Sequence, residues 1–173
     1  WAMTLEEALD DFRFLDSLPG TKIIGKGNHD FWWATASKMY KFFETNSLTS
    51  LRILYNNSFE CEGKIVCGSR GWFSEEANQK TVGDVSWIKI VERETLRLKM
   101  SLESSEAADG CEKIVFLHFP PIWSNSICTD IIELLHVHNV TRCFFGHIHG
   151  IYSGEVNFDH EGIRFELISA DYL

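Results

Sequence analysis

The chain has 173 residues, of which 45% are hydrophobic and 24% are charged, an ordinary composition for a folded, soluble protein. Its formal net charge of −9 disfavours nucleic acid as a partner, because contacts with phosphates need clustered Lys and Arg. No apolar run approaches the ~20 residues that a membrane-spanning helix needs, so we expect no membrane partner.

The first part of the chain is predicted to alternate between helices and strands. Thr4-Leu5-Glu6-Glu7 has the form of a capping box, and apolar residues then recur at helical spacing up to Leu18, just before Pro19-Gly20. A helix is therefore expected over 5–18. It is followed by a short buried strand over 21–26, a second helix with Trp33 to Phe43 on its apolar face, and a strand over 51–55.

The rest of the chain continues this alternation and ends in strands. A hairpin is expected over 59–68 around Glu62-Gly63, and a long helix over 87–108 with Gly110 as its stop. Further strands are expected over 113–117, 142–145, 151–158 and 163–169, with a helix around 131–135 between the first two. One mixed α/β domain covering 1–173 is the simplest account of this order.

The five cysteines are odd in number and fit no zinc-ribbon spacing. With no signal peptide before them, they are expected to be reduced thiols of a cytoplasmic protein. The chain starts at Trp1, and Met3 is a poor start because a helix cap follows at once. We therefore expect the native protein to extend upstream of Trp1.

Three of the expected strands run directly into polar side chains that are able to bind metals. These are Asn28-His29-Asp30, His118, and His147 with His149. In α/β sheets the ends of the strands are where ligands bind, so these side chains are expected to converge on one cleft.

The chemistry of these side chains favours a metal centre. His147 and His149 are separated by one residue, and the flanking Gly146 and Gly150 allow a turn tight enough to aim the two imidazoles at different metals. Imidazole nitrogens suit Zn, Fe and Mn, whereas an amide oxygen such as that of Asn28 suits harder ions. A mixed set of nitrogen and oxygen donors fits a binuclear site that binds phosphate.

In the order of its motifs the sequence resembles the calcineurin-like metallophosphoesterases. That family carries, in order, D-x-H, G-D-x-x-D, G-N-H-D/E, a lone His and G-H-x-H. The chain has the last three, as Gly27-Asn28-His29-Asp30, His118 and Gly146-His147-Ile148-His149. Each motif is short, but three in order, each at a strand end, are far more specific. The resemblance implies a four-layer α/β/β/α fold, with two β-sheets packed face to face and helices outside.

The resemblance also implies a centre of two divalent metal ions, which would be Mn, Fe or Zn. Asn28, His118 and His147 would bind one ion, and His149 the other. A water activated by the two ions would attack the phosphorus of a phosphomonoester or phosphodiester in line. The protein would thus be a metal-dependent hydrolase that acts on phosphate-ester substrates.

The remaining candidate residues would assist this reaction. The resemblance implies that His29 acts near the leaving-group oxygen, as a general acid or charge stabiliser. Asp30 would hydrogen-bond His29 and fix its tautomer. Arg70, which lies between glycines, could fork onto a substrate phosphate, but a plain salt bridge is an equally open interpretation.

The first two motifs of the family have no counterpart upstream of Asn28. In the family they supply the bridging Asp and two further ligands. The residues that are present provide three ligands for one metal and one for the other. The missing ligands are therefore expected before Trp1 in the native protein, and the chain by itself is expected to have little or no activity.

Less specific interpretations of the same residues also stay open. Gly27-Asn28-His29-Asp30 could be a plain turn in which Asp30 caps the following helix. His136 and His138 lie at the end of a predicted helix and are expected to be structural, and His160 is expected in a turn.

Two other function classes compete with the hydrolase. A non-catalytic binding module on the same scaffold typically lacks the catalytic histidine, whereas His29 is present here. A metal-storage or structural site has no open position and no neighbouring acid–base pair. The sequence therefore favours the enzyme, and its acidic charge favours a small or protein-borne phosphate as the substrate.

Overall fold

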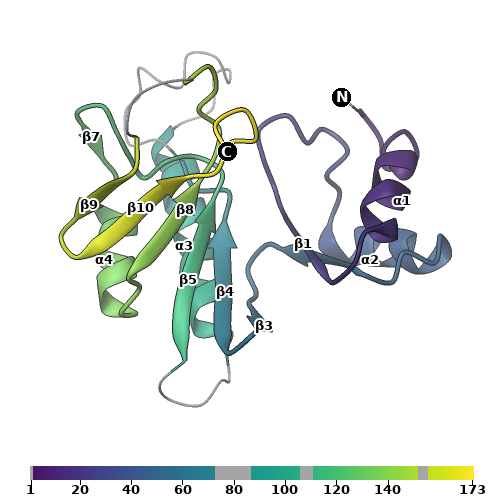
Figure 1. The fold of residues 1–173 in the computed structure, drawn as a ribbon, viewed down its shortest axis with the longest axis horizontal. Helices are drawn as coiled ribbons and strands as arrows, with labels where there is room; N and C mark the ends of the chain where they lie inside the picture. Colours follow the sequence, from purple (N-terminus) through teal and green to yellow (C-terminus); the bar gives the residue numbers. More distant parts are fainter. Residues whose placement is uncertain (1, 73–86, 106–110, 152–155) are drawn as a thin grey trace.

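The computed structural model describes residues 2–72, 87–105, 111–151 and 156–173 (Figure 1). The helices of these ranges are α1 (Leu9–Ser17), α2 (Ala36–Thr45), α3 (Trp87–Glu103) and α4 (Thr129–Val137). The strands are β1 (Lys22–Gly25), β2 (Leu51–Leu54), β3 (Phe59–Cys61), β4 (Lys64–Ser69), β5 (Glu112–Leu117), β6 (Ile122–Trp123), β7 (Ser126–Ile127), β8 (Arg142–Phe145), β9 (Phe158–His160) and β10 (Ile163–Leu167).

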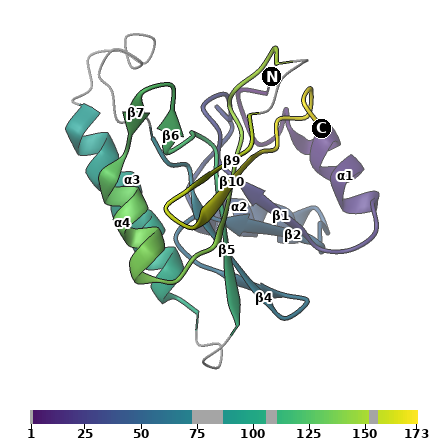
Figure 2. The ribbon, with the colours of Figure 1, turned by 60° about the vertical axis from the view of Figure 1, so that its left-hand side comes forward.

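The elements are stacked in layers, as the mixed α/β fold predicted from the sequence requires. Six strands form one sheet in the order β3-β4-β5-β8-β10-β9, while β1 pairs with β2 and β6 with β7. The helices α3 and α4 cover one side of the six-stranded sheet (Figure 2). The β1–β2 pair lies on the other side, with α1 and α2 beyond it. The α/β fold class is therefore confirmed.

The main core lies between the six-stranded sheet and its two helices. In β4, Ile65 and Cys67 pack in the same buried cluster as Leu98 and Leu102 of α3. Val66 lies between them in sequence and lines a cavity instead. This is the period of two that a strand imposes, whereas the two leucines are four residues apart on one face of a helix.

A second core holds the smaller layers together. Phe12 of α1 packs with Met39 and Phe43 of α2, and with Leu51 and Ile53 of β2. The rings of Phe12 and Phe43 meet edge to face with centroids 5.2 Å apart, an arrangement that aromatic pairs prefer. The β1–β2 layer is therefore packed against α1 and α2, and this packing holds the end of β1 in place.

Parallel pairing places several strand ends side by side. The strands β4, β5, β8 and β10 run parallel to one another, and the edge strands β3 and β9 are antiparallel to their neighbours. The register pairs Leu117 of β5 with Phe145 of β8. The residues that follow these two strands therefore leave the sheet at the same level.

The first helix begins later than the spacing of apolar residues predicts. The backbone N–H of Glu7 donates to Thr4 Oγ1 at 3.2 Å, as in a capping box. The carboxylate of Glu7, however, accepts from Met3 N at 2.7 Å. Leu9 N bonds to Glu6 O at 3.3 Å, three residues back rather than four. Ala8 N, by contrast, bonds to Thr4 O at 3.1 Å, four residues back, so the turn mixes the two bond types and the regular helix α1 begins at Leu9.

Other boundaries also differ from the prediction. The helix α2 begins at Ala36, because the Thr35 side chain accepts from Lys38 N at 3.4 Å and caps it. The β6–β7 hairpin was not predicted, since its two-residue strands are too short to show a period. The helix α3 ends at Glu103, five residues before the predicted end at 108, because Ser104 and Ser105 are no longer helical. The predicted stop at Gly110, and part of the predicted strand over 151–158, lie outside the described residues.

All five cysteines are free thiols, as the sequence predicts. Among the helices that the structure describes, none combines the length and the apolar character needed to cross a bilayer.

Candidate functional site

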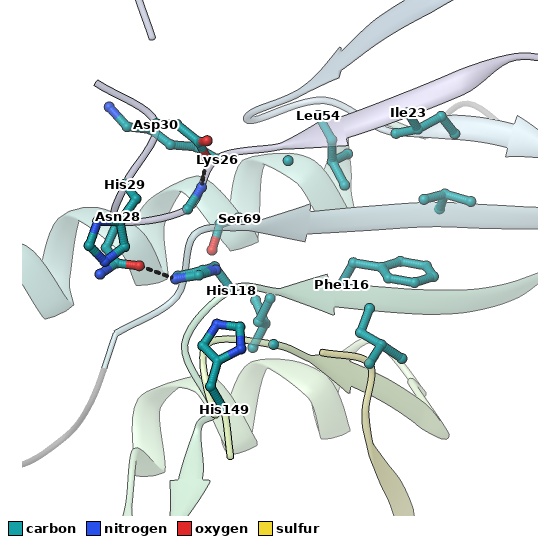
Figure 3. Close-up of a pocket in the computed structure, with 16 residues that line it drawn as sticks. Ile23, Lys26, Asn28, His29, Asp30, Leu54, Ser69, Phe116, His118 and His149 are labelled. Carbon is teal, nitrogen blue, oxygen red and sulfur yellow. Dashed lines mark hydrogen bonds between the residues drawn. The ribbon is translucent and has the colours of Figure 1, made fainter. Parts of the chain in front are cut away.

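A pocket of about 720 Å³ opens where β1, β4, β5 and β8 end (Figure 3). Asn28, His29 and His118 gather at one end of this pocket, and His149 lies near them. The other end reaches between the two sheets and is lined by apolar side chains, which are Ile23, Leu54, Val66, Phe116 and Ile168. The candidate polar residues are thus concentrated at the strand ends.

Three potential metal donors lie within contact of one another. The distance from Asn28 Oδ1 to His118 Nε2 is 2.6 Å, and to His147 Nδ1 it is 3.4 Å. The two ring nitrogens are 3.2 Å apart. Ligands around one ion with bonds of ~2.1 Å and angles of ~90–110° lie roughly 3.0–3.4 Å apart. The distances of 3.2 and 3.4 Å lie in this range, whereas the 2.6 Å between Asn28 Oδ1 and His118 Nε2 is that of a direct hydrogen bond, so these two atoms would move slightly apart to bind one ion together.

The donor set is unusual in that one member is an amide. Within the described ranges, no three His, Cys, Asp or Glu side chains form a group that could hold a metal ion. The third donor here is the amide oxygen of Asn28, which suits a hard ion, while the two imidazoles suit Zn, Fe or Mn. The residues present therefore fit one divalent ion of the kind that the family uses.

The electrostatics keep both imidazoles in the form that binds metals. Burial, followed by the neighbouring His147, lowers the pKa of His118 to about 3. Burial and then His149 lower the pKa of His147 from its ordinary value. Both rings are therefore neutral at pH 7, and a neutral imidazole has a lone pair available for a metal.

The backbone turn that aims His147 is located on His147 itself. Its φ angle is 69°, in the left-handed region that side chains other than Gly rarely adopt. Gly146 was expected to make this turn, but it has no positive φ, whereas Gly150 has one of 76°. Gly146 N instead donates to the carbonyls of Leu117 and His118, each at 3.2 Å, and so joins the ends of β5 and β8.

The Gly27-Asn28-His29-Asp30 turn is closed by Asp30, whose carboxylate accepts from Gly27 N. The interpretation of Asp30 as a helix cap is wrong, because Thr35 caps α2. A Cβ on Gly27 would lie 3.1 Å from both Asp30 Oδ2 and His118 Cε1. The glycine therefore allows the turn to pack directly against the ring of His118.

Replacing Gly27 by alanine is expected to weaken the binding of a divalent metal about tenfold, because the added Cβ would displace the ring of His118. The measurement is a titration with Co²⁺ followed by visible absorption. Gly25→Ala is the matched control, since a Cβ at Gly25 meets nothing within 4 Å. Equal affinities of the two variants would contradict the close packing of this turn on His118.

His29 is exposed and lines the pocket beside Asn28, but it is not one of the three converging donors. Its ring meets that of Phe31 edge to face, with centroids 6.0 Å apart. A solvent-accessible imidazole therefore lies beside the donors of Asn28, His118 and His147.

His149 lines the same pocket and is paired with a residue that the sequence analysis missed. Its Nδ1 lies 2.9 Å from Asp171 Oδ1, and Gly150 N donates to Asp171 Oδ2 at 2.9 Å. The Gly150 bond, followed by that of His149, holds the pKa of Asp171 below its ordinary value. A carboxylate at Nδ1 favours the tautomer in which Nε2 faces a metal. No motif surrounds Asp171, so only the fold reveals this pair.

Arg70 makes the salt bridge that the sequence left open. Its guanidinium lies 3.2 Å from Glu94 Oε1 and stacks over the ring of Trp72, 4.6 Å from the centroid. Only 16% of its side chain is exposed. Bidentate binding of a substrate phosphate by Arg70 stays a prediction. Outside the pocket, His136 pairs with Glu161 at 3.1 Å, in keeping with a structural role.

A comparison with protein families gives a match that contains all three motifs. The family model described as calcineurin-like phosphoesterase matches residues 5–150, most of the chain. No curated protein matches the chain.

Proposed function

This chain belongs to the calcineurin-like phosphoesterase family, and from that premise we propose that it hydrolyses phosphate esters with the help of two divalent metal ions. The observation that supports the proposal most directly is the triangle of Asn28, His118 and His147 donors, of which Asn28 and His118 line the pocket. Such a group of neutral imidazoles and an amide oxygen, open to a cleft, has the composition of a catalytic rather than a closed structural site.

We assign Asn28, His118 and His147 to one ion and His149 to the other. Asp171 supports this assignment, because it accepts the Nδ1 proton of His149 and leaves Nε2 toward a ligand. When bound, the two ions would make a nucleophile of water and offset the charge of the phosphoryl oxygens. Every other step falls to side chains of the chain itself.

His29 is the proposed general acid. It is exposed beside the triangle, and its ring can donate a proton to the leaving-group oxygen as the bond to phosphorus breaks. The carboxylate of Asp30 is held in place by Gly27 N, and we propose that it also orients the ring of His29. This division separates residues that hold metal from residues that move a proton.

The proposal is tested on protein expressed from its complete reading frame. When loaded with Mn²⁺ or Zn²⁺, that protein is expected to hydrolyse 4-nitrophenyl phosphate or bis(4-nitrophenyl) phosphate, and the two substrates distinguish a monoesterase from a diesterase. Chelation should abolish turnover, and added Mn²⁺ should restore it. A protein that binds metal but cleaves neither substrate would favour the binding module. A protein that binds no metal would contradict the proposed centre.

A further inference from the structure

A buried carboxylate outside the pocket is connected to the donor triangle. Glu94 lies on α3, a helix that carries none of the three motifs, and its side chain is 0% exposed. Its Oε1 lies 2.6 Å from Arg97, 3.2 Å from Arg70 and 3.5 Å from Arg93. Buried ion pairs add little stability compared with apolar packing, because burying the charges is costly. This arrangement therefore calls for an explanation other than stability.

Two of the three arginines that meet Glu94 are themselves fixed by aromatic rings. Arg70 stacks on Trp72, which is 1% exposed. Arg97 lies over the ring of Tyr55, 4.6 Å from the centroid, and donates to the Tyr55 hydroxyl at 2.5 Å. Each guanidinium is thus held on one side by a ring and on the other by the carboxylate. Glu94 is the shared anchor of both.

Arg70 connects Glu94 to the proposed metal ligands. It directly follows Ser69, the last residue of β4. Its carbonyl accepts from His118 N at 3.0 Å and from Phe119 N at 2.9 Å. A second route runs through rings, since the centroids of Trp72 and Phe119 are 4.5 Å apart and those of Phe119 and His147 are 4.4 Å apart. His118 and His147, two of the three donors, are therefore connected to the segment around Arg70 that Glu94 holds in place.

We infer that Glu94, acting through Arg70, is a positioning residue that sets the place of His118 and His147 for metal binding. The inference rests on the proposed function. The charge of Glu94 contributes as well. The positive charge of Arg70 would repel a cation bound at His118. The neighbouring carboxylate offsets that repulsion.

The test is a Co²⁺ titration followed by visible absorption, which reports both affinity and coordination geometry. Glu94→Gln is expected to weaken Co²⁺ binding at least tenfold and to shift the absorption bands, as outer-shell changes do. Arg70→Met should have a similar effect. Because Glu94 acts through Arg70, the double variant Glu94→Gln/Arg70→Met should bind Co²⁺ no more weakly than whichever single variant has the lower affinity.

Leu98→Ala is the matched control. Leu98 lies one turn further along α3, is 0% exposed and packs in the core between α3 and the six-stranded sheet. Its truncation destabilises the fold by about 2–5 kcal/mol, but it should leave Co²⁺ affinity and spectrum unchanged. Thermal unfolding followed by circular dichroism confirms that each variant is folded. If Glu94→Gln does not fold, the double variant takes its place, because it removes Glu94 and Arg70 together, and Arg97 keeps its bond to the Tyr55 hydroxyl. It should still bind Co²⁺ at least tenfold more weakly.

The outcomes separate this inference from the proposed function. If folded Glu94→Gln, or the double variant, keeps the wild-type Co²⁺ affinity and absorption spectrum, the positioning role is overturned and the proposed function is not affected. Additive losses in the double variant would also overturn it, because Glu94 would then act independently of Arg70. A loss in Leu98→Ala equal to that in Glu94→Gln would assign the effect to stability. A wild-type protein that does not bind Co²⁺ would overturn the metal centre and this inference together.

Discussion

Replacing His29 by alanine is expected to lower kcat by about 10²–10⁴ while the metal content of the protein stays the same. The reason is the position of this side chain. His29 is exposed at the pocket beside Asn28, whereas the converging donors are those of Asn28, His118 and His147. Removing its ring takes away a proton donor and leaves the metal ligands in place. The measurements are steady-state kinetics and metal analysis of the same preparations.

The choice of substrate makes this prediction specific. A phenyl phosphate has a poor leaving group and needs the proton, whereas 4-nitrophenolate leaves without much help. The loss in His29→Ala should therefore be larger for phenyl phosphate. His136→Ala is the control, because His136 pairs with Glu161 outside the pocket. Equal losses on the two substrates would contradict a role as general acid and favour a role in binding.

Replacing His147 by alanine is expected to weaken divalent metal binding more than the 10–100-fold that is typical of outer-shell changes, and to abolish turnover with it. Its Nδ1 is one corner of the triangle, 3.2 Å from His118 Nε2 and 3.4 Å from Asn28 Oδ1. The variant removes one of the three donors that this chain supplies to the ion. The measurements are metal analysis after gel filtration and a Co²⁺ titration.

The backbone of His147 adds a second consideration to this variant. Its φ of 69° is uncommon for any residue with a Cβ, and alanine at this position keeps the same constraint. The fold is therefore expected to persist, and thermal unfolding checks this. A folded His147→Ala protein with wild-type metal content would show that His147 is not a ligand. A loss of turnover with full metal content would assign His147 to the substrate instead.

The patterns of single segments predicted much of the fold. Ile23 and Ile24 before a glycine, the period of two around Ile65 and Cys67, and the turn at Glu62-Gly63 are local signals, and each element lies where they indicate. These signals work because backbone hydrogen bonding and side-chain direction repeat within a few residues. Helix starts were less predictable. Thr35 rather than Asp30 caps α2, and nothing in the two side chains themselves distinguishes them as caps.

The same logic applies to the candidate site. The motifs place polar residues directly after β1, β5 and β8, and the parallel pairing of β5 with β8 brings His118 and His147 together. Asn28 follows β1 of another sheet, so the packing of the two sheets decides its place. The family match over 5–150 supports the class of the protein that these motifs indicated. The roles of the individual residues as ligands and proton donors stay predictions, which the variants above test.

The sequence by itself determined which residue types stand at the strand ends, because a motif is read along the chain. Only the tertiary structure decided their partners. Asp171 meets His149 across 22 positions, and Glu94 meets Arg70 across 24. The positive φ falls on His147 rather than on Gly146, whose N–H joins two strand ends. Pairing between distant side chains depends on how sheets and helices pack, and local periodicity carries no record of that packing.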